Sequence, residues 1–303
     1  MSQMENFLKL VGETKGMNER LQGVTERHDV YPAIAPEAAF SNQSFKGKAV
    51  LITGASRGLG PVMASFFARA GAKLALVARS ASNLDAVKKQ IQQEESGAEV
   101  LTFAVDVTDT QAAAKIVQDT VDHFGRLDIV IPNAGISIPP DGTVLGNRDV
   151  TQWWKTLEVN LLGTLNFVSP ALEHLKKTNG YVIGMSSIAA QTRLYSSSDY
   201  GVSKFALNRL LEFVDLEYSG SVKTFSLHPG AVLTDMAKNS GMPEQFFVDT
   251  PELAAATILA LTSGQYDWLS GRFVDANKDL GEVQQLKEQI LSKDALVNKL
   301  VVF

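Results

Sequence analysis

Short apolar runs rich in β-branched residues alternate with longer stretches of helical periodicity over most of this chain. Apolar runs of this kind are typical of parallel strands buried between two layers of helices. Right-handed crossovers then join such strands into an open, doubly wound parallel α/β sheet of about seven strands, with helices on both faces. The predicted strands are Ala49–Thr53, Lys73–Ala78, Val100–Val105, Asp128–Ile131, Tyr181–Met185, Val222–Leu227 and Arg272–Val274. The predicted helices are Pro61–Ala70, Asn83–Glu95, Gln111–Phe124, Trp153–Lys176, Val202–Tyr218 and Pro251–Leu261.

The alternation divides the chain into three segments. Residues 46–276 form the predicted α/β domain, and residues 1–45 precede it as an extension. Within the extension, residues 24–46 carry two prolines and no sustained period, which predicts an arm or linker with order beginning at Lys46. Residues 277–303 form a polar, helical tail that we expect to pack at the edge of the domain or at an oligomer contact.

The first residues of the extension predict a short amphipathic helix. One helical face collects four apolar side chains, namely Met4, Phe7, Leu8 and Val11. Charged residues interrupt this segment before an apolar core long enough for a signal peptide can form. We expect the helix to pack on the body of the chain or on a sister subunit, because its polar face is not basic enough for a membrane surface.

Composition excludes several classes of function. Lys and Arg number 28 against 33 Asp and Glu, so the net charge of −5 gives no electrostatic footprint for nucleic acid or an anionic membrane. No run approaches the ~18 apolar residues of a membrane helix. The chain has no cysteine, which excludes disulfides, thiol catalysis and cysteine-based metal sites and agrees with a cytoplasmic protein. The four histidines form no recognisable metal or triad pattern, so we expect no metal.

A glycine-rich turn follows the first predicted strand and opens a helix. Gly54, Gly58 and Gly60 lie in the segment TGASRGLG. Glycines there let backbone N–H groups approach a pyrophosphate, to which the helix N-terminus adds positive potential. The placement therefore predicts a dinucleotide site, although the spacing differs from the usual Gly-x-Gly-x-x-Gly.

The end of the second predicted strand suggests which dinucleotide is bound. An NAD-binding chain usually has a carboxylate there, which bonds the ribose 2′-hydroxyl. This chain instead has Ala78, Arg79 and Ser80. Arg79 and Arg57 of the glycine-rich turn are able to clamp a 2′-phosphate, which predicts NADP(H). The alternative is that both arginines are ordinary solvated surface residues.

A tyrosine and a lysine one helical turn apart form the second chemical signal. On a helix, residues four apart such as Tyr200 and Lys204 lie on one face. A free phenol has a pKa of about 10, and a nearby ammonium group lowers it towards values useful for proton transfer. Ser187 follows a predicted strand and is placed to bond a substrate carbonyl. The alternatives are that Tyr200 and Lys204 form an ordinary surface pair and that Ser187 only caps a helix or turn. A serine hydrolase is excluded because the nucleophile motif lacks its closing glycine.

Together these motifs resemble the short-chain dehydrogenase/reductase family, whose fold is of the Rossmann type. The resemblance covers roughly residues 46–276, and the segments YPAIAP and GRFVDAN are similar to fungal-type members. It implies that Tyr200 is the acid/base, that Lys204 also binds the nicotinamide ribose, that Ser187 orients the carbonyl and that Asn160 holds a water linking Lys204 to solvent. It further implies that Asn133-Ala134-Gly135 supports the central strand beside the cofactor.

The implied cofactor contacts extend along several strand ends. Asp106 would touch the adenine, and the loop from Pro229 to Thr234 would cover the nicotinamide. The complete expected cofactor set is Gly54, Ser56, Arg57, Gly58, Leu59, Gly60, Arg79, Ser80, Asp106, Asn133, Ala134, Gly135, Tyr200, Lys204, Pro229, Gly230, Val232 and Thr234. The expected catalytic set is Asn160, Ser187, Tyr200 and Lys204.

The function predicted from these residues is NADPH-dependent reduction of a ketone or aldehyde, with the reverse alcohol oxidation open to the same groups. Loops at 136–150, 188–199 and 233–249 should line an apolar or aromatic substrate pocket, with Gly241-Met242-Pro243 as the start of a lid. The candidate lining residues are Ile138, Tyr195, Met236, Met242, Phe246 and Phe247, which pack a core or lid helix in the alternative reading.

Rival functions are epimerisation, dehydration or another biosynthetic step on the same fold, and non-catalytic NADP(H) binding. The family resemblance also implies a homodimer or homotetramer.

Overall fold

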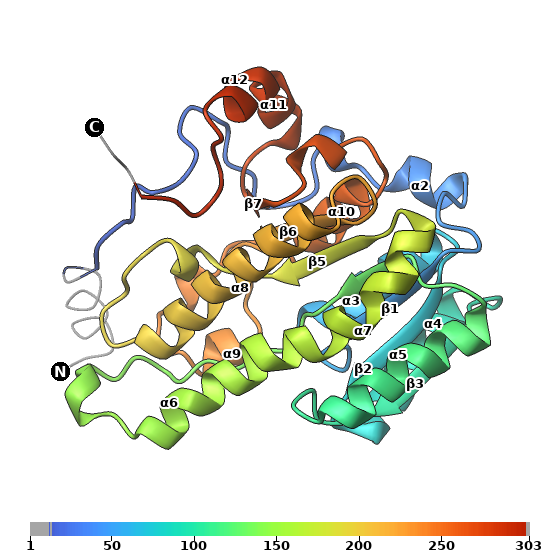
Figure 1. Cartoon of the computed structure of the whole chain (residues 1–303), viewed down its shortest axis with the longest axis horizontal. Coiled ribbons are helices and arrows are strands. Elements are labelled where there is room, and N and C mark those ends of the chain that lie inside the picture. Colours follow the sequence, from blue (N-terminus) through green and yellow to red (C-terminus); the bar gives the residue numbers. More distant parts are fainter. Residues whose placement is uncertain (1–11, 13, 301–303) are drawn as a thin grey trace.

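A computed structural model describes residues 12 and 14–300 as one α/β layer structure (Figure 1). The predicted amphipathic helix over Met4, Phe7, Leu8 and Val11 lies outside the described residues. Within the described part, no helix is both long and apolar enough to cross a bilayer.

The sheet has seven parallel strands in the order β3-β2-β1-β4-β5-β6-β7. The strands are β1 (Ala49–Thr53), β2 (Lys73–Ala78), β3 (Val100–Ala104), β4 (Ile129–Ile131), β5 (Tyr181–Met185), β6 (Lys223–His228) and β7 (Arg272–Asp275). This confirms the predicted doubly wound sheet. The strand order reverses between β1 and β4, so the carboxyl ends of these two strands mark the switch point at which ligands bind in such folds.

Helices cover both faces of the sheet (Figure 1). One face is covered by α3 (Leu59–Arg69), α4 (Ala81–Glu94) and α10 (Pro251–Leu261), and the other by α5 (Thr110–Phe124), α7 (Gly163–Thr178) and α8 (Ser198–Glu217). Side chains of β1 alternate between the two cores: Val50 and Ile52 pack with the first set of helices, Ala49 and Leu51 with the second. Every residue of β1 is buried, as expected for a central parallel strand.

Shorter elements join these layers. The remaining helices of the described residues are α2 (Glu37–Ser41), α6 (Val150–Leu157), α9 (Asp235–Lys238), α11 (Leu280–Gln285) and α12 (Lys287–Ser292). Single 3₁₀ turns occur at Pro32–Ile34, Leu145–Asn147, Ile188–Ala190, Glu244–Phe246 and Asp267–Leu269.

The predicted single helix Trp153–Lys176 is divided in the structure. α6 ends at Leu157, a π-helical turn spans Glu158–Leu162, and α7 begins at Gly163. The π turn adds a residue to one helical turn and places Asn160 in the interior, fully buried. Single π turns of this kind are found frequently at functional sites.

The extension and the tail pack into the main core. Val24, Tyr31, Ile34 and Phe45 are buried in the core beneath α3 and α10. Regular structure therefore begins before Lys46, earlier than the sequence predicts, because these scattered apolar residues have no period to reveal them. The tail contributes Leu280, Val283 and Ile290 to the same core.

Candidate active site

The glycine-rich turn between β1 and α3 forms a cradle that admits no side chain at two positions. A Cβ on Gly60 would lie 2.4 Å from the carbonyl oxygen of Gly54, and a Cβ on Gly54 would lie 2.9 Å from the Ala134 backbone. Gly54 and Gly58 have φ values of 65° and 61°, which L side chains rarely adopt. Bare backbone directly before a helix N-terminus fits a pyrophosphate group.

The segment after β4 supports this cradle. The Asn133 Nδ2 donates to the carbonyl oxygens of Thr53 at 2.9 Å and Gly54 at 3.1 Å. The Ala134 N–H donates to the Thr53 hydroxyl at 3.1 Å. Asn133 and Ala134 thus tie the chain after β4 to the end of β1.

The residues expected at the adenosine end lie at the ends of β2 and β3. Arg79 is exposed, while the Ser80 hydroxyl caps α4 by accepting the Asn83 N–H. Asp106 accepts the N–H and hydroxyl of Thr108. The Thr108 N–H lowers the pKa of Asp106, and the positive charge of Arg79 contributes further. Arg79 and Asp106 are thus near neighbours at this edge.

Arg57 projects from the glycine-rich turn towards α9. Its guanidinium lies 3.6 Å from the Asp235 carboxylate, and both side chains are more than half exposed. An exposed pair at this separation is weak, so Arg57 keeps the freedom to bind an incoming anion.

Tyr200, Lys204 and Ser187 come together at the carboxyl end of β5. Tyr200 and Lys204 lie on α8, and the Lys204 Nζ is 5.6 Å from the centroid of the tyrosine ring. The Lys204 Nζ donates to the Met185 carbonyl oxygen at 2.7 Å, two residues before Ser187. The side chains of Ser187 and Tyr200 are hydrogen-bonded to each other. The three residues therefore form one cluster, as the sequence pattern predicts.

The electrostatics of this cluster differ from the sequence expectation. Burial raises the pKa of Tyr200, and the hydrogen bond with Ser187 lowers it only in part. Lys204, whose ammonium group donates to the Met185 carbonyl, does not lower the pKa of Tyr200 as expected. Burial lowers the pKa of Lys204 itself to about 8. Tyr200 is accordingly held as a neutral phenol, the form that donates a proton.

Asn160 lies beside this cluster, inside the π turn. Its Oδ1 accepts the Ile136 N–H at 2.8 Å, and its Nδ2 donates to the Ile136 carbonyl at 2.9 Å and to the Ser203 hydroxyl at 3.0 Å. A Cβ on Gly135 would lie 3.2 Å from the Asn160 Oδ1 and 3.5 Å from the Lys204 Nζ. Gly135 therefore allows the asparagine and the lysine to approach the same strand end.

The loop after β6 brings Pro229–Thr234 to the same edge of the sheet. Gly230 turns at a φ of 93°, Val232 is buried, and the Thr234 hydroxyl caps α9 by accepting the Ala237 N–H. Asp249 accepts a hydrogen bond from the Ala231 N–H. Backbone bridging between Val232 and Asp249 closes this loop onto the chain that precedes α10.

Sequence reasoning missed the buried groups that hold the start of α8. Asp199, adjacent to Tyr200, is fully buried and accepts the Thr156 hydroxyl at 2.8 Å. Arg148 lies 3.7 Å from the other carboxylate oxygen and is itself almost buried. An acidic residue in the first turn of a helix is a common sequence signal, but nothing in the pattern showed its partners.

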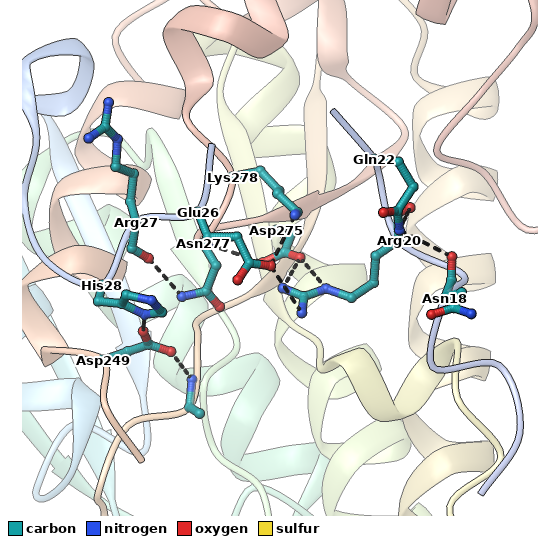
Figure 2. Close-up of polar contacts among 11 residues, drawn as sticks. Asn18, Arg20, Gln22, Glu26, Arg27, His28, Asp249, Asp275, Asn277 and Lys278 are labelled. Carbon is teal, nitrogen blue, oxygen red and sulfur yellow. Dashed lines mark hydrogen bonds and ion pairs between the residues drawn. The ribbon is translucent and has the colours of Figure 1, made fainter. Parts of the chain in front are cut away.

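A second missed group joins the N-terminal arm to the loops of the site. The His28 Nδ1 lies 2.6 Å from Asp249 (Figure 2). Upstream of the arm, Lys15 and Arg193 exchange backbone hydrogen bonds, and Arg193 is paired with Glu19 at 2.8 Å. The N-terminal extension thus contacts both the loop after Ser187 and the chain beside Gly230.

The apolar residues expected around the substrate lie outside both hydrophobic cores. Met236 and Phe246 are exposed, and the other four are half-buried, namely Ile138, Tyr195, Met242 and Phe247. None of the six belongs to the two clusters that pack against the sheet. This argues against the alternative in which they are core residues.

Comparison with known proteins identifies the family. A family model described as short chain dehydrogenase matches residues 48–245. The chain is 40% identical over 286 residues to the short chain dehydrogenase mpl6 of Monascus purpureus, which covers 91% of this chain and 94% of that protein. It is 35% identical over 291 residues to the short chain dehydrogenase pigC of Monascus ruber, covering 91% and 93%.

A solved structure extends the comparison to the fold. A 7 alpha-hydroxysteroid dehydrogenase, complexed with NADH and 7-oxo glycochenodeoxycholic acid, has a TM-score of 0.70 and 24% identity to this chain, and the match covers 82% of this chain and 97% of that one. At that identity the likeness concerns the fold alone. The family match, the fungal relatives and the cradle beside the Tyr200 cluster lead to one conclusion: this chain belongs to the short-chain dehydrogenase/reductase family, whose members are oxidoreductases that bind a nicotinamide dinucleotide.

Proposed function

We propose that the protein is a cytoplasmic, NADP(H)-dependent oxidoreductase that reduces a ketone or aldehyde and also catalyses the reverse oxidation. The observation that carries this proposal is the cluster at the end of β5. It joins a neutral tyrosine to a serine hydroxyl and sets a buried lysine on the next helical turn. This cluster lies on the same edge of the sheet as the glycine cradle.

Each residue of the cluster has a chemical role in carbonyl reduction. The Ser187 hydroxyl donates to the substrate carbonyl oxygen and orients it, while Tyr200 gives that oxygen its proton as charge develops there. Lys204, anchored on the Met185 carbonyl oxygen, would bind the nicotinamide ribose. Asn160 holds the chain after β4 in place at Ile136, next to Gly135, which Lys204 approaches. The nicotinamide group, when bound, supplies the hydride.

The preference for NADP(H) rests on the end of β2. The position where a carboxylate would bond a ribose 2′-hydroxyl is Ala78, and the exposed guanidinium of Arg79 follows it. A guanidinium group binds phosphate through paired, charge-assisted hydrogen bonds. Arg57 supports the preference because only a weak, exposed ion pair holds it.

The proposed substrate is a small molecule with an apolar or aromatic body. The loops after β5 and β6 present Tyr195, Met236 and Phe246 without burying them in a core. Apolar walls with a few convergent polar groups are typical of small-molecule sites.

The experiment is a panel of aliphatic and aromatic ketones, aldehydes and alcohols, assayed with NADPH and with NADH. Consumption of the reduced cofactor is followed together with the mass of the product. We expect a carbonyl compound to gain two hydrogens and NADPH to bind more tightly than NADH. A product of unchanged mass would instead indicate epimerisation, and a product lighter by one water would indicate dehydration. Tighter binding of NADH would contradict the cofactor preference.

A further inference from the structure

Asp249 lies where the loop after β6 meets the N-terminal arm (Figure 2). Its side chain is only 3% exposed. The carboxylate accepts the Ala231 N–H, and the Asp249 N–H donates to the Ala231 carbonyl at 3.2 Å. A Cβ on Gly230 would lie 2.7 Å from the Asp249 Oδ2. Asp249 therefore holds the backbone of Ala231 and packs closely against Gly230.

The second oxygen of this carboxylate faces the arm. The His28 Nδ1 lies 2.6 Å from the Asp249 Oδ1, and since an ionised carboxylate only accepts, the imidazole donates. The His28 carbonyl in turn accepts the Thr250 N–H at 2.9 Å. A buried carboxylate is stable only when its oxygens are paired, so His28 completes the site that holds Asp249 in place.

The N-terminal extension is anchored at the end of β7 by two sets of hydrogen bonds. Arg27 and Asn277 exchange two hydrogen bonds, from the Arg27 N–H at 2.8 Å and from the Asn277 Nδ2 at 2.9 Å. The Arg20 guanidinium binds Asp275 through hydrogen bonds of 2.7 and 2.9 Å (Figure 2). The arm is thus a fixed support from which His28 reaches the loop.

We propose that Asp249 is a positioning residue for the nicotinamide end of the cofactor, and that His28 of the arm holds Asp249 in that position. This inference rests on the proposed function, in which Pro229–Thr234 lies over the nicotinamide. Asp249 supports that loop through its hydrogen bond with Ala231. The proposed adenosine contacts follow β2 and β3, at the opposite end of the strand order from β6. A change at His28 should therefore act on one end of the cofactor.

The test compares three variants of the full chain. His28→Ala removes the donor, and His28→Asn restores an N–H at a similar reach. Glu282→Ala is the matched control, because Glu282 also binds the arm, accepting the Thr25 N–H at 2.8 Å and its hydroxyl at 2.7 Å, from α11. Dissociation constants are measured for NADPH and NADH and for their adenosine halves, 2′,5′-ADP and 5′-ADP. Hydrogen exchange of residues 230–234 is measured without ligand.

We expect His28→Ala to weaken binding of the whole dinucleotide about tenfold, the size of one hydrogen bond to a charged group. The adenosine halves should bind as to wild type, and exchange at Ala231 should be faster. His28→Asn should restore both measurements, and Glu282→Ala should change neither.

Unchanged exchange in His28→Ala, or equal weakening of the dinucleotide and its adenosine half, would overturn the positioning role. A wild-type protein that binds neither dinucleotide would overturn the proposed function itself. The two failures are distinguished because the second is seen without any variant.

Discussion

The buried side chain of Lys204 lowers the stability of the folded chain while serving the proposed active site. It is almost fully buried, and its ammonium group donates to the Met185 carbonyl oxygen. Burial lowers the pKa of its ammonium group from 10.5 to about 8. Below pH 8 the lysine is charged in both the folded and the unfolded chain, so the folded state bears the full desolvation cost of about 3 kcal/mol. As pH rises from 8 to 10.5, only the folded chain loses the proton, and this cost disappears.

Replacing Lys204 with methionine should therefore raise stability while abolishing turnover. We expect Lys204→Met to increase the free energy of unfolding at pH 7 by about 1–2 kcal/mol, because the lost hydrogen bond to Met185 offsets part of the relieved desolvation. Urea denaturation at pH 7 and at pH 10.5 measures the effect, and the difference from wild type should shrink at the higher pH. A variant less stable than wild type at pH 7 would contradict this interpretation.

At the scale of elements, the site depends on places where the backbone departs from regular geometry. The turn between β1 and α3 requires bare glycines, and the π turn between α6 and α7 places Asn160 against Ile136. The regular strands and helices supply the frame, and these two irregular turns present backbone and side-chain groups at its carboxyl edge. Function of this fold is therefore sensitive to small backbone changes at the turns.

Gly60→Ala is the sharpest test of the glycine cradle. A Cβ at that position would lie 2.4 Å from the Gly54 carbonyl oxygen, so the turn must shift. We expect the dissociation constant of NADPH to rise at least about tenfold, with a loss of stability of about 1–3 kcal/mol, typical of overpacking. Gly97→Ala is the control, because its Cβ meets no atom within 4 Å and it should change neither quantity. Unaltered cofactor affinity in Gly60→Ala would refute the cradle.

The sequence pattern predicts the regular elements well and the irregular ones poorly. The strands lie within one residue of their predicted bounds, because buried parallel strands are continuous apolar runs. Tyr200, Lys204 and Ser187 are brought together as predicted, since helical spacing and strand ends are local signals. The π turn, the raised pKa of Tyr200 and the pair of His28 with Asp249 were not predictable. They depend on tertiary contacts, in the last case between residues 221 positions apart.

At the scale of the whole molecule, the outer face of α8 is unusually apolar for a surface helix. Four exposed side chains follow one helical stripe, with exposed fractions of 46% for Val202, 46% for Phe205, 52% for Phe213 and 71% for Leu216. We propose this stripe, which Arg209 interrupts, as the contact of the predicted homo-oligomer.

Introducing charge into this stripe should separate the subunits. We expect wild type to have the mass of a dimer or tetramer in light scattering coupled to size exclusion, and Leu216→Glu to have that of a smaller species. Leu291→Glu is the control, because Leu291 is a similarly exposed apolar residue on α12, away from the stripe. A wild-type protein that is monomeric at micromolar concentration would contradict the assignment.

The central claim is that Tyr200 gives the proton in an oxidoreductase reaction, and Tyr200→Phe tests it most directly. The substitution removes one hydroxyl and keeps the ring that packs near Lys204. We expect the variant to bind NADPH with a dissociation constant within about twofold of wild type, while carbonyl reduction falls by about 10³-fold or more. A variant that binds NADPH normally and turns over substrate at a rate close to wild type would show that the proton comes from elsewhere.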